Sequence, residues 1–309
     1  MTEPPHHEVL RQDDLRFIYK DKPTELAIAL CSIWPTKLNW EHIQDGKHVS
    51  VGLHGIAAAI MFLRRMYAVP LMNNLVFAKP TLLMKLAWRK EPFSEEGEPG
   101  LLQALSQELG FAINGGEGPT LLEILNHDSM ANVWDEPSML LVNPNFIRME
   151  DGQPENLVQI DSLSDHCKKF MLLLRRDPGD QLAGYFDSLW GTGRTQYKKQ
   201  CNFPPFIRAR YQAYRADLKK PQSFSSLRRF QLRASVLASG TNTTERERSY
   251  VLIACFLNPN ENNKVGELRL YSTDGRPMMP RNKPPPGEQH LYDPDAERRL
   301  CDPDVDCIL

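Results

Sequence analysis

The spacing of apolar residues changes along this chain, and that change limits the folds open to it. Up to about residue 220, apolar side chains recur every three or four positions, which is the period of a helix buried on one face. Beyond that point they recur every second position or form β-branched runs, as strands do. The sequence therefore predicts an α+β fold: a helical N-terminal two-thirds, then a small antiparallel β meander, with a Pro-rich extended C-terminal tail.

Several segments before residue 220 are predicted to be helices. The clearest runs from Leu53 to Tyr67, where apolar residues are spaced by three and four before Pro70 ends the element. A second, 101–109, closes at Gly110, a residue suited to the left-handed helix terminus. The remaining predicted helices are 24–34, a short one after Pro119, 164–176 and 180–190.

Three segments after residue 220 are predicted to be strands: 230–238, 249–257 and 265–271. The last two are joined by the turn-forming residues 258–263. We predict a loose N-terminal arm over 1–22, a single globular domain over 23–271 and a Pro-rich tail over 272–309. The sequence shows neither a secretory signal nor a long apolar span, so we expect an intracellular protein without membrane contact.

Charge is sorted into blocks, although the formal net charge is only −2. Residues 91–136 carry ten carboxylates and no Lys or Arg, whereas residues 194–233 carry eleven Lys or Arg and one acid, Asp217. A face of one sign attracts partners of the opposite sign. The basic block therefore predicts an acidic protein partner. Pairing between the two blocks and an ordinary solvated basic face are the alternatives.

No catalytic or metal signature accompanies these blocks, so we predict no enzyme, no metal and no cofactor. His42, His48 and His54 are spaced by six, which does not align them on one helical face, and no CxxC is present. The Asp165-His166-Cys167 run places neighbours side by side, where they cannot meet as a catalytic set. The glycine-rich segments near 115 and 191 lack the Lys-Ser/Thr of a phosphate loop.

The alternative to a non-enzymatic protein is a hydrolase. The order of an early apolar helix and a late β-hairpin is similar to ubiquitin-specific proteases, active or degenerate. The segment resembling that family's nucleophile region, Gly52–Met61, has no cysteine, and Tyr250 follows Ser249 where the family has a His-Tyr pair. These departures put an active enzyme of this kind in doubt.

The basic block contains a predicted helix with one apolar stripe, formed by Ile207, Tyr211, Tyr214 and Leu218. Phe203, Arg208, Arg210 and Arg215 are the candidate partner-binding residues. A second alternative function is direct nucleic-acid binding, with the two tyrosines stacking on bases. Direct DNA binding is disfavoured because the pI is about 6.5 and no zinc finger, basic zipper or helix-turn-helix is present.

The segment Asn202-Phe203-Pro204-Pro205-Phe206, followed by Arg- and Tyr-rich sequence, resembles the Pro-Pro-Phe domain of filamentous-fungal mating-type proteins of the mat A-2-like family. The positions carried over are Pro204, Pro205 and Phe206. The resemblance implies a regulator of sexual development, needed for fertilisation or ascospore formation. It also implies partners among the α-box and HMG-box regulators encoded beside that family.

The two prolines have a physical consequence of their own. Pro204-Pro205 fixes two φ angles and removes two backbone donors, which gives a stiff entry that sets the direction of Phe203 and Phe206. The phenylalanines either anchor this loop to the core or face a partner. We expect Phe206 to be buried, in which case Phe206→Ala costs about 3–5 kcal/mol.

Overall fold

The computed structural model describes residues 12–37, 39–44, 47–68, 80–93, 100–112, 116–135, 137–160, 172–174, 177–212, 214–215, 220–221, 225–237, 243–257, 267–274, 276, 278 and 306–308. The chain groups into two compact units. The first is Met1–Ser129 with Met278–Gln289, and the second is Met130–Pro277 with His290–Leu309. Both units hold part of the 23–271 range predicted above as one domain.

The first unit is built around one buried helix, α3 (His54–Tyr67), whose residues are covered on almost every side. Three other helices pack on it: α2 (Pro23–Ser32), α4 (Leu82–Ala87) and α6 (Leu121–Asn126). The short α1 (Leu15–Ile18) packs on α2, and α5 (Leu101–Leu109) packs on α4. A hairpin of β1 (Asn39–Gln44) and β2 (Lys47–Gly52) extends through parallel pairing with β3 (Gly116–Glu117).

Arg64 of α3 is fully buried and ties helix ends together within this unit. Its Nε donates to the Ala87 carbonyl at 2.8 Å, and its Nη atoms donate to the carbonyls of Ile33 and Arg89. These carbonyls lie at the C-terminal ends of α2 and α4, where a helix leaves acceptors without partners. The guanidinium therefore satisfies groups that would otherwise be buried without hydrogen bonds.

The second unit contains three separate β structures. A four-stranded antiparallel sheet has the order β5-β4-β8-β7, and a long ribbon pairs β12 with β13. A five-stranded sheet has the order β15-β14-β16-β9-β6, in which β6 and β9 run parallel. The bounds are β4 (Asn145–Glu150), β5 (Asn156–Gln159), β6 (Leu172–Leu174), β7 (Leu189–Trp190), β8 (Thr195–Lys198), β9 (Ala209–Gln212), β12 (Arg229–Leu237), β13 (Thr243–Val251), β14 (Ala254–Leu257), β15 (Glu267–Leu270) and β16 (Asp306–Ile308).

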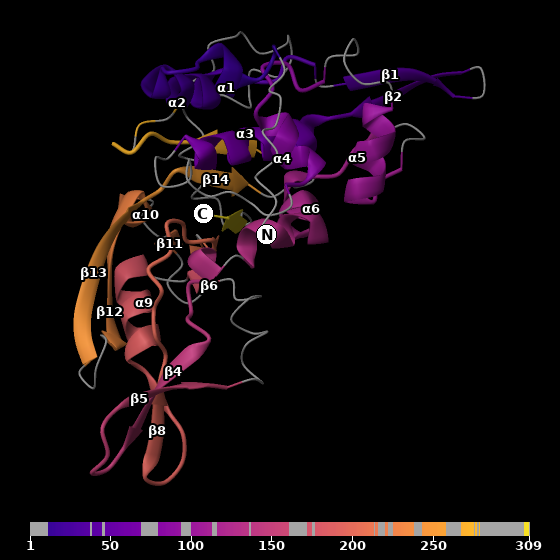
Figure 1. Cartoon of the computed structure of the whole chain (residues 1–309). Helices are drawn as coiled ribbons and strands as arrows, with labels where there is room; N and C mark the ends of the chain where they lie inside the picture. The colour runs from indigo at the N-terminus through magenta and orange to yellow at the C-terminus, as the bar shows by residue number, and fades with distance from the viewer. Residues whose placement is uncertain are drawn as a thin grey trace, which may run out of the picture. The chain divides into compact units, whose positions relative to one another are not determined.

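Short elements complete this unit. Helix α9 (Pro178–Asp187) runs along β12 (Figure 1), and α10 (Ser225–Arg228) leads into that strand. The remaining elements are α7 (Ala131–Trp134), the 3-10 helix η2 (Pro137–Met139) and the small pair of β10 (Tyr214–Arg215) with β11 (Lys220–Pro221). The 3-10 helix η1 (Asp128–Met130) includes the last two residues of the first unit's main segment and the first residue of the second unit.

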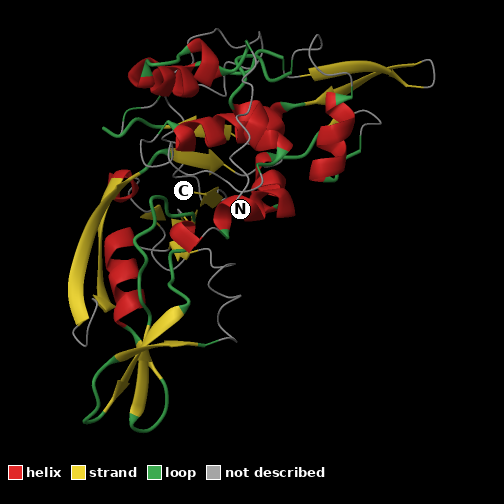
Figure 2. Cartoon of the chain, viewed as in Figure 1, coloured by secondary structure: helices red, strands yellow, loops and turns green. Residues whose placement is uncertain are grey.

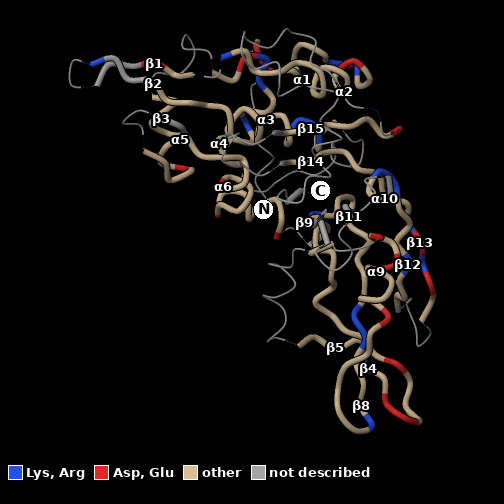
Figure 3. Tube along the Cα trace, turned by 180° about the vertical axis from the view of Figure 1, so that it is seen from behind, with Lys and Arg blue, Asp and Glu red and all other residues tan. Residues whose placement is uncertain are grey.

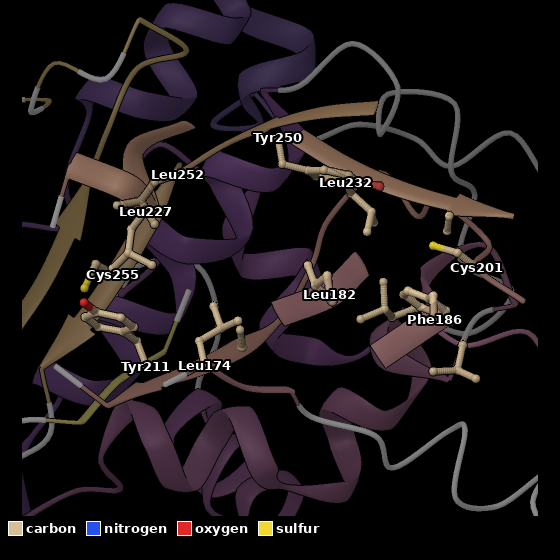
Figure 4. Close-up of a cluster of buried hydrophobic side chains, with 14 of the residues drawn as sticks. Leu174, Leu182, Phe186, Cys201, Tyr211, Leu227, Leu232, Tyr250, Leu252 and Cys255 are labelled. Atoms are coloured by element: carbon tan, nitrogen blue, oxygen red, sulfur yellow. The ribbon is translucent and has the colours of Figure 1, made fainter. Parts of the chain in front are cut away.

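One hydrophobic cluster joins these parts of the second unit. Leu182 and Phe186 of α9 lie near Leu232 of β12, and Tyr211 of β9 lies near Cys255 of β14 (Figure 4). All five side chains are at most 1% exposed. The helix, the ribbon and the five-stranded sheet therefore share a core within this unit.

The predicted arrangement of a helical first two-thirds and a late β meander is wrong. Strands occur in both halves of the chain, beginning with β1 and β2, and α9 and α10 lie in the second half (Figure 2). The ribbon β12–β13 and the pair β14–β15 belong to different sheets, because the predicted strand 249–257 is interrupted at 252–253. The fold remains α+β, with strands about as abundant as helices among the described residues.

Two further expectations need correction. The residues predicted as a helix from Ile207 onward form strands β9 and β10 instead. Ala209 and Tyr211, two positions apart, are both 1% exposed, so burial has the period of a strand. Within the predicted tail 272–309, residues 306–308 form β16, which pairs with both β14 and β9. Of the predicted helix 164–176, residues 172–174 are strand β6, and 164–171 lie outside the described residues.

Candidate partner-binding site

The Pro-Pro-Phe loop, which we define as residues 201–208, connects β8 to β9 in the second unit. Its first residues are fixed to the segment 141–143. The backbones of Cys201 and Val142 form an isolated antiparallel β-bridge, and the Asn202 N–H donates to the Leu141 carbonyl at 3.2 Å. The Asn143 side-chain Nδ2 donates to the Asn202 Oδ1 at 2.6 Å. The loop therefore begins from a fixed position.

Phe203 has an unusual backbone, with φ at +49°. Left-handed conformations are uncommon for bulky residues and cost about 1 kcal/mol or more. Its N–H donates to the Cys201 Sγ at 3.3 Å, and its carbonyl accepts a bond from the Arg248 guanidinium. Its ring packs against the hydrophobic cluster. These contacts stabilise a conformation that the isolated loop would avoid.

Pro204 is buried, and its carbonyl is held by strand β13. The Tyr250 hydroxyl donates to it at 2.8 Å, and Arg248 Nη1 lies 3.4 Å away. Because residues two apart point to the same face of a strand, both side chains reach the loop from one face of β13. Burial raises the pKa of Tyr250 above its ordinary value, so its hydroxyl stays protonated and remains a donor.

Pro205 and Phe206 are half-buried. Phe203 and Ile207 are also half-buried, and both pack against the hydrophobic cluster. Phe206 is not among the described residues that pack against it. The core contact expected of Phe206 is therefore made by Phe203 and Ile207. Phe206 itself is partly accessible.

The three candidate arginines occupy different environments. The Arg208 guanidinium carbon lies 5.1 Å from the ring centroid of Trp134, and burial lowers the pKa of Arg208 to about 10. Arg210 is exposed on β9. Arg215 belongs to β10, but its side chain lies outside the described part of the chain. Because Arg210 lies on β9 and Arg215 on β10, the helix predicted from Ile207 onward does not present them. Tyr211 is buried in the hydrophobic cluster, where it cannot stack on a base.

Along β13 the charged residues are mixed rather than sorted. Acidic and basic positions alternate along β13, as Figure 3 shows. Two basic-block residues pair with acids outside the acidic block: Lys198 with Asp187 at 3.1 Å and Arg233 with Glu247 at 3.1 Å. Their charge is therefore partly offset locally. Of the candidate arginines whose side chains are described, Arg210 on β9 is exposed and Arg208 is half-buried.

The Cys201 thiol of this loop is not activated as a nucleophile. Burial raises the pKa of the Cys201 thiol to about 12, so the thiol stays protonated at neutral pH. Within the described ranges no group of three or more His, Cys, Asp or Glu could hold a metal ion. The histidine side chains at 42 and 48 and the run Asp165–Cys167 lie outside what the structure describes.

Sequence reasoning missed Arg248, Tyr250, Cys201 and Trp134 as parts of this site. Arg248 and Tyr250 lie 44 to 46 residues beyond the carbonyls that they bind, so only the three-dimensional pairing brings them to the loop. One signal was present: Arg248 and Tyr250 occupy alternate positions of a strand-like segment ending in a buried tyrosine.

No family model, curated protein or solved structure matches this chain. The resemblance to mating-type proteins therefore rests on residues 202–206 and their basic surroundings. Over the described residues, no helix has both the length and the apolar character needed to cross a membrane.

Proposed function

We propose that this chain is a non-enzymatic regulator of fungal sexual development that acts through protein contact. The Pro-Pro-Phe loop and Arg210 form its contact surface, and an α-box or HMG-box regulator is its partner. The resemblance of residues 202–206 supports the biological role. The geometry of the loop supports the mode of action.

The observation that carries the proposal is the fixing of two successive carbonyls, those of Phe203 and Pro204, by Arg248 and Tyr250. A loop held in one conformation loses little conformational entropy when it binds. The part of Phe206 left accessible supplies an apolar contact of the kind found at interface centres. Arg210, exposed four residues later, supplies charge that speeds association with an acidic surface.

The test is capture of purified α-box and HMG-box proteins by the full chain, immobilised at physiological salt. We expect Phe206→Ala and Arg210→Glu each to reduce capture at least 10-fold, which is about 1.4 kcal/mol of binding energy. Arg246→Glu, an equally exposed change on β13, is the matched control and should leave capture unchanged. Melting temperatures of all three variants distinguish lost contact from unfolding.

A fungal cross tests the biological role separately. A strain carrying Phe206→Ala should fail at fertilisation or ascospore formation while growing normally. If that strain is fertile and the Phe206→Ala protein captures its partners as well as the wild type does, both the biological role and the contact through Phe206 are contradicted. Steep salt dependence of binding to arbitrary duplex DNA, with sub-micromolar affinity, would instead favour nucleic acid as the partner.

A further inference from the structure

A strand of only three residues lies in the middle of the five-stranded sheet. β16, residues 306–308, is placed between β14 and β9 in the strand order. Ile308 pairs with Phe256 on one side and with Arg210 on the other, and Cys307 pairs with Leu257 and Tyr211. Without β16 the sheet would separate into two pairs, β15–β14 and β9–β6. One three-residue segment therefore supplies the strand pairing between two parts that otherwise meet through side chains of the hydrophobic cluster.

The strands on either side of β16 are anchored without it. On β9, Ala209 and Tyr211 are buried, and β9 also pairs with β6. On β14, Cys255 and Phe256 are buried, and β14 also pairs with β15. Each neighbouring strand therefore has pairing and buried contacts that do not involve β16. β16 itself has only two register pairs with β14 and three with β9.

We infer that the space between β14 and β9 is a binding slot for an extended peptide, which the chain's own residues 306–308 occupy. Adding a strand between exposed edges is a general mode of peptide recognition, in which main-chain hydrogen bonds supply affinity. A slot with edges on both sides offers such bonds in two directions. The inference does not depend on the role in sexual development.

The foreign occupant is a segment of another protein with the pattern of the resident strand, an acidic residue two positions before isoleucine. The pattern is taken from the resident sequence Asp306-Cys307-Ile308, whose backbone pairs with both edges. Arg210, exposed on β9 in register with Ile308, also places positive charge at the slot and favours an acidic segment. Residues 306–308 act as a competitor in the same chain, which lowers the apparent affinity for a foreign segment.

A labelled hexapeptide corresponding to residues 304–309, with Cys307→Ser, is the probe for this slot. Binding to the full chain is measured by fluorescence anisotropy for the wild type and for Ile308→Pro, since proline is not tolerated in a central strand. We expect Ile308→Pro to bind the peptide at least about 10-fold more tightly than the wild type, because the internal competitor is removed. Asp304→Pro, outside β16, is the matched control and should bind like the wild type.

Three outcomes would overturn the inference. One is equal binding by the wild type and Ile308→Pro, or no binding to either up to about 1 mM peptide. Another is binding of a peptide with proline at the isoleucine position. The third is a concentration-dependent dimer of the wild type that Ile308→Pro does not form, which would make a second copy the occupant.

If Ile308→Pro does not fold, amide hydrogen exchange of the wild type tests whether β16 can leave the sheet. A displaceable strand opens without global unfolding. The amides of 307 and 308 should therefore exchange at least ten times faster than those of Tyr211 and Cys255. Equal protection at all four would show that β16 is an integral strand, and the slot would be rejected.

Discussion

Phe203 and Pro204 show how single residues of the Pro-Pro-Phe loop depend on side chains far away in the sequence. The left-handed backbone of Phe203 is compensated by bonds at its N–H and carbonyl, and its ring packs on the cluster. The rigidity of the loop is therefore a property of β13 as much as of the two prolines. Changes on β13 should be felt in the loop.

Tyr250→Phe tests that dependence. It removes the hydroxyl that donates to the Pro204 carbonyl and leaves the ring in place. We expect the free energy of unfolding to fall by about 1 kcal/mol, the usual net value of one hydrogen bond. Tyr197→Phe is the matched control, since no hydrogen bond of its hydroxyl is found among the described residues, and it should change stability little. Urea denaturation measures both, and equal effects would contradict the assigned role of Tyr250.

Replacing Arg208 and replacing Arg210 should lower the stability of the protein by different amounts. Arg208→Ala removes a partly buried guanidinium stacked on Trp134, so we expect a loss of about 1–2 kcal/mol. Arg210→Ala changes an exposed side chain and should stay within about 0.5 kcal/mol. Thermal unfolding of the two variants measures both losses. A larger loss of stability for Arg210→Ala would mean that the role of Arg210 is structural.

Cys201 makes stability depend on alkaline pH. Burial raises the pKa of its thiol from an ordinary value near 9 to about 12, so the unfolded chain loses this proton at a lower pH than the folded one. The contribution to stability is therefore complete below about pH 9 and disappears as pH rises toward 12. Between these values we expect the wild type to lose up to about 1.4 kcal/mol per pH unit more than Cys201→Ala. Val142→Ala, which alters packing beside Cys201 without removing a thiol, should keep the wild-type slope in urea titrations.

At the scale of elements, Gly55 shows how closely α3 approaches its neighbours. A Cβ added there would overlap the Pro119 carbonyl oxygen and lie 2.8 Å from the Thr120 carbonyl carbon. Helix propensity alone predicts that Gly55→Ala gains about 1 kcal/mol. We expect instead a net loss of about 2 kcal/mol, because backbone overlap in a packed region outweighs propensity. Ala58→Gly on the same helix should cost about 1 kcal/mol by propensity, and a stabilising Gly55→Ala would contradict the observed packing.

The elements that could be predicted are those with local signals. The helix 53–67 and the helix closing at Gly110 follow from spacing and end signals, and both are present as α3 and α5. The stripe from Ile207 to Leu218 also has helical spacing, yet its first half forms β9 because the sheet supplies neighbours on both sides. A strand of three residues, such as β16, carries no periodic signal. The same limit applies to the site, where residues 202–206 were identifiable but Arg248 and Tyr250 were not.

At the scale of the whole molecule, each compact unit has its own stabilising centre. Arg64→Leu leaves the carbonyls of Ile33 and Ala87 without their donor in the first unit, and we expect a loss of about 3 kcal/mol or more. Hydrogen exchange should show lower protection in α2–α4 and unchanged protection in β12–β13. Lys20→Leu, an exposed change in the same unit, should leave both patterns unaltered. Loss of protection in the ribbon would indicate that the units unfold together.

The position of β16 also constrains how the molecule is made. A ribosome adds about 5–20 residues per second, and domains begin to fold as they emerge. The helices around α3 have all been synthesised once Asn126 has left the ribosomal exit tunnel. β9 and β14 lack the strand that lies between them until Asp306–Ile308 has been synthesised. During that interval the facing edges of β9 and β14 can pair with any extended chain. The nascent protein is therefore the form that most needs a chaperone to prevent such pairing.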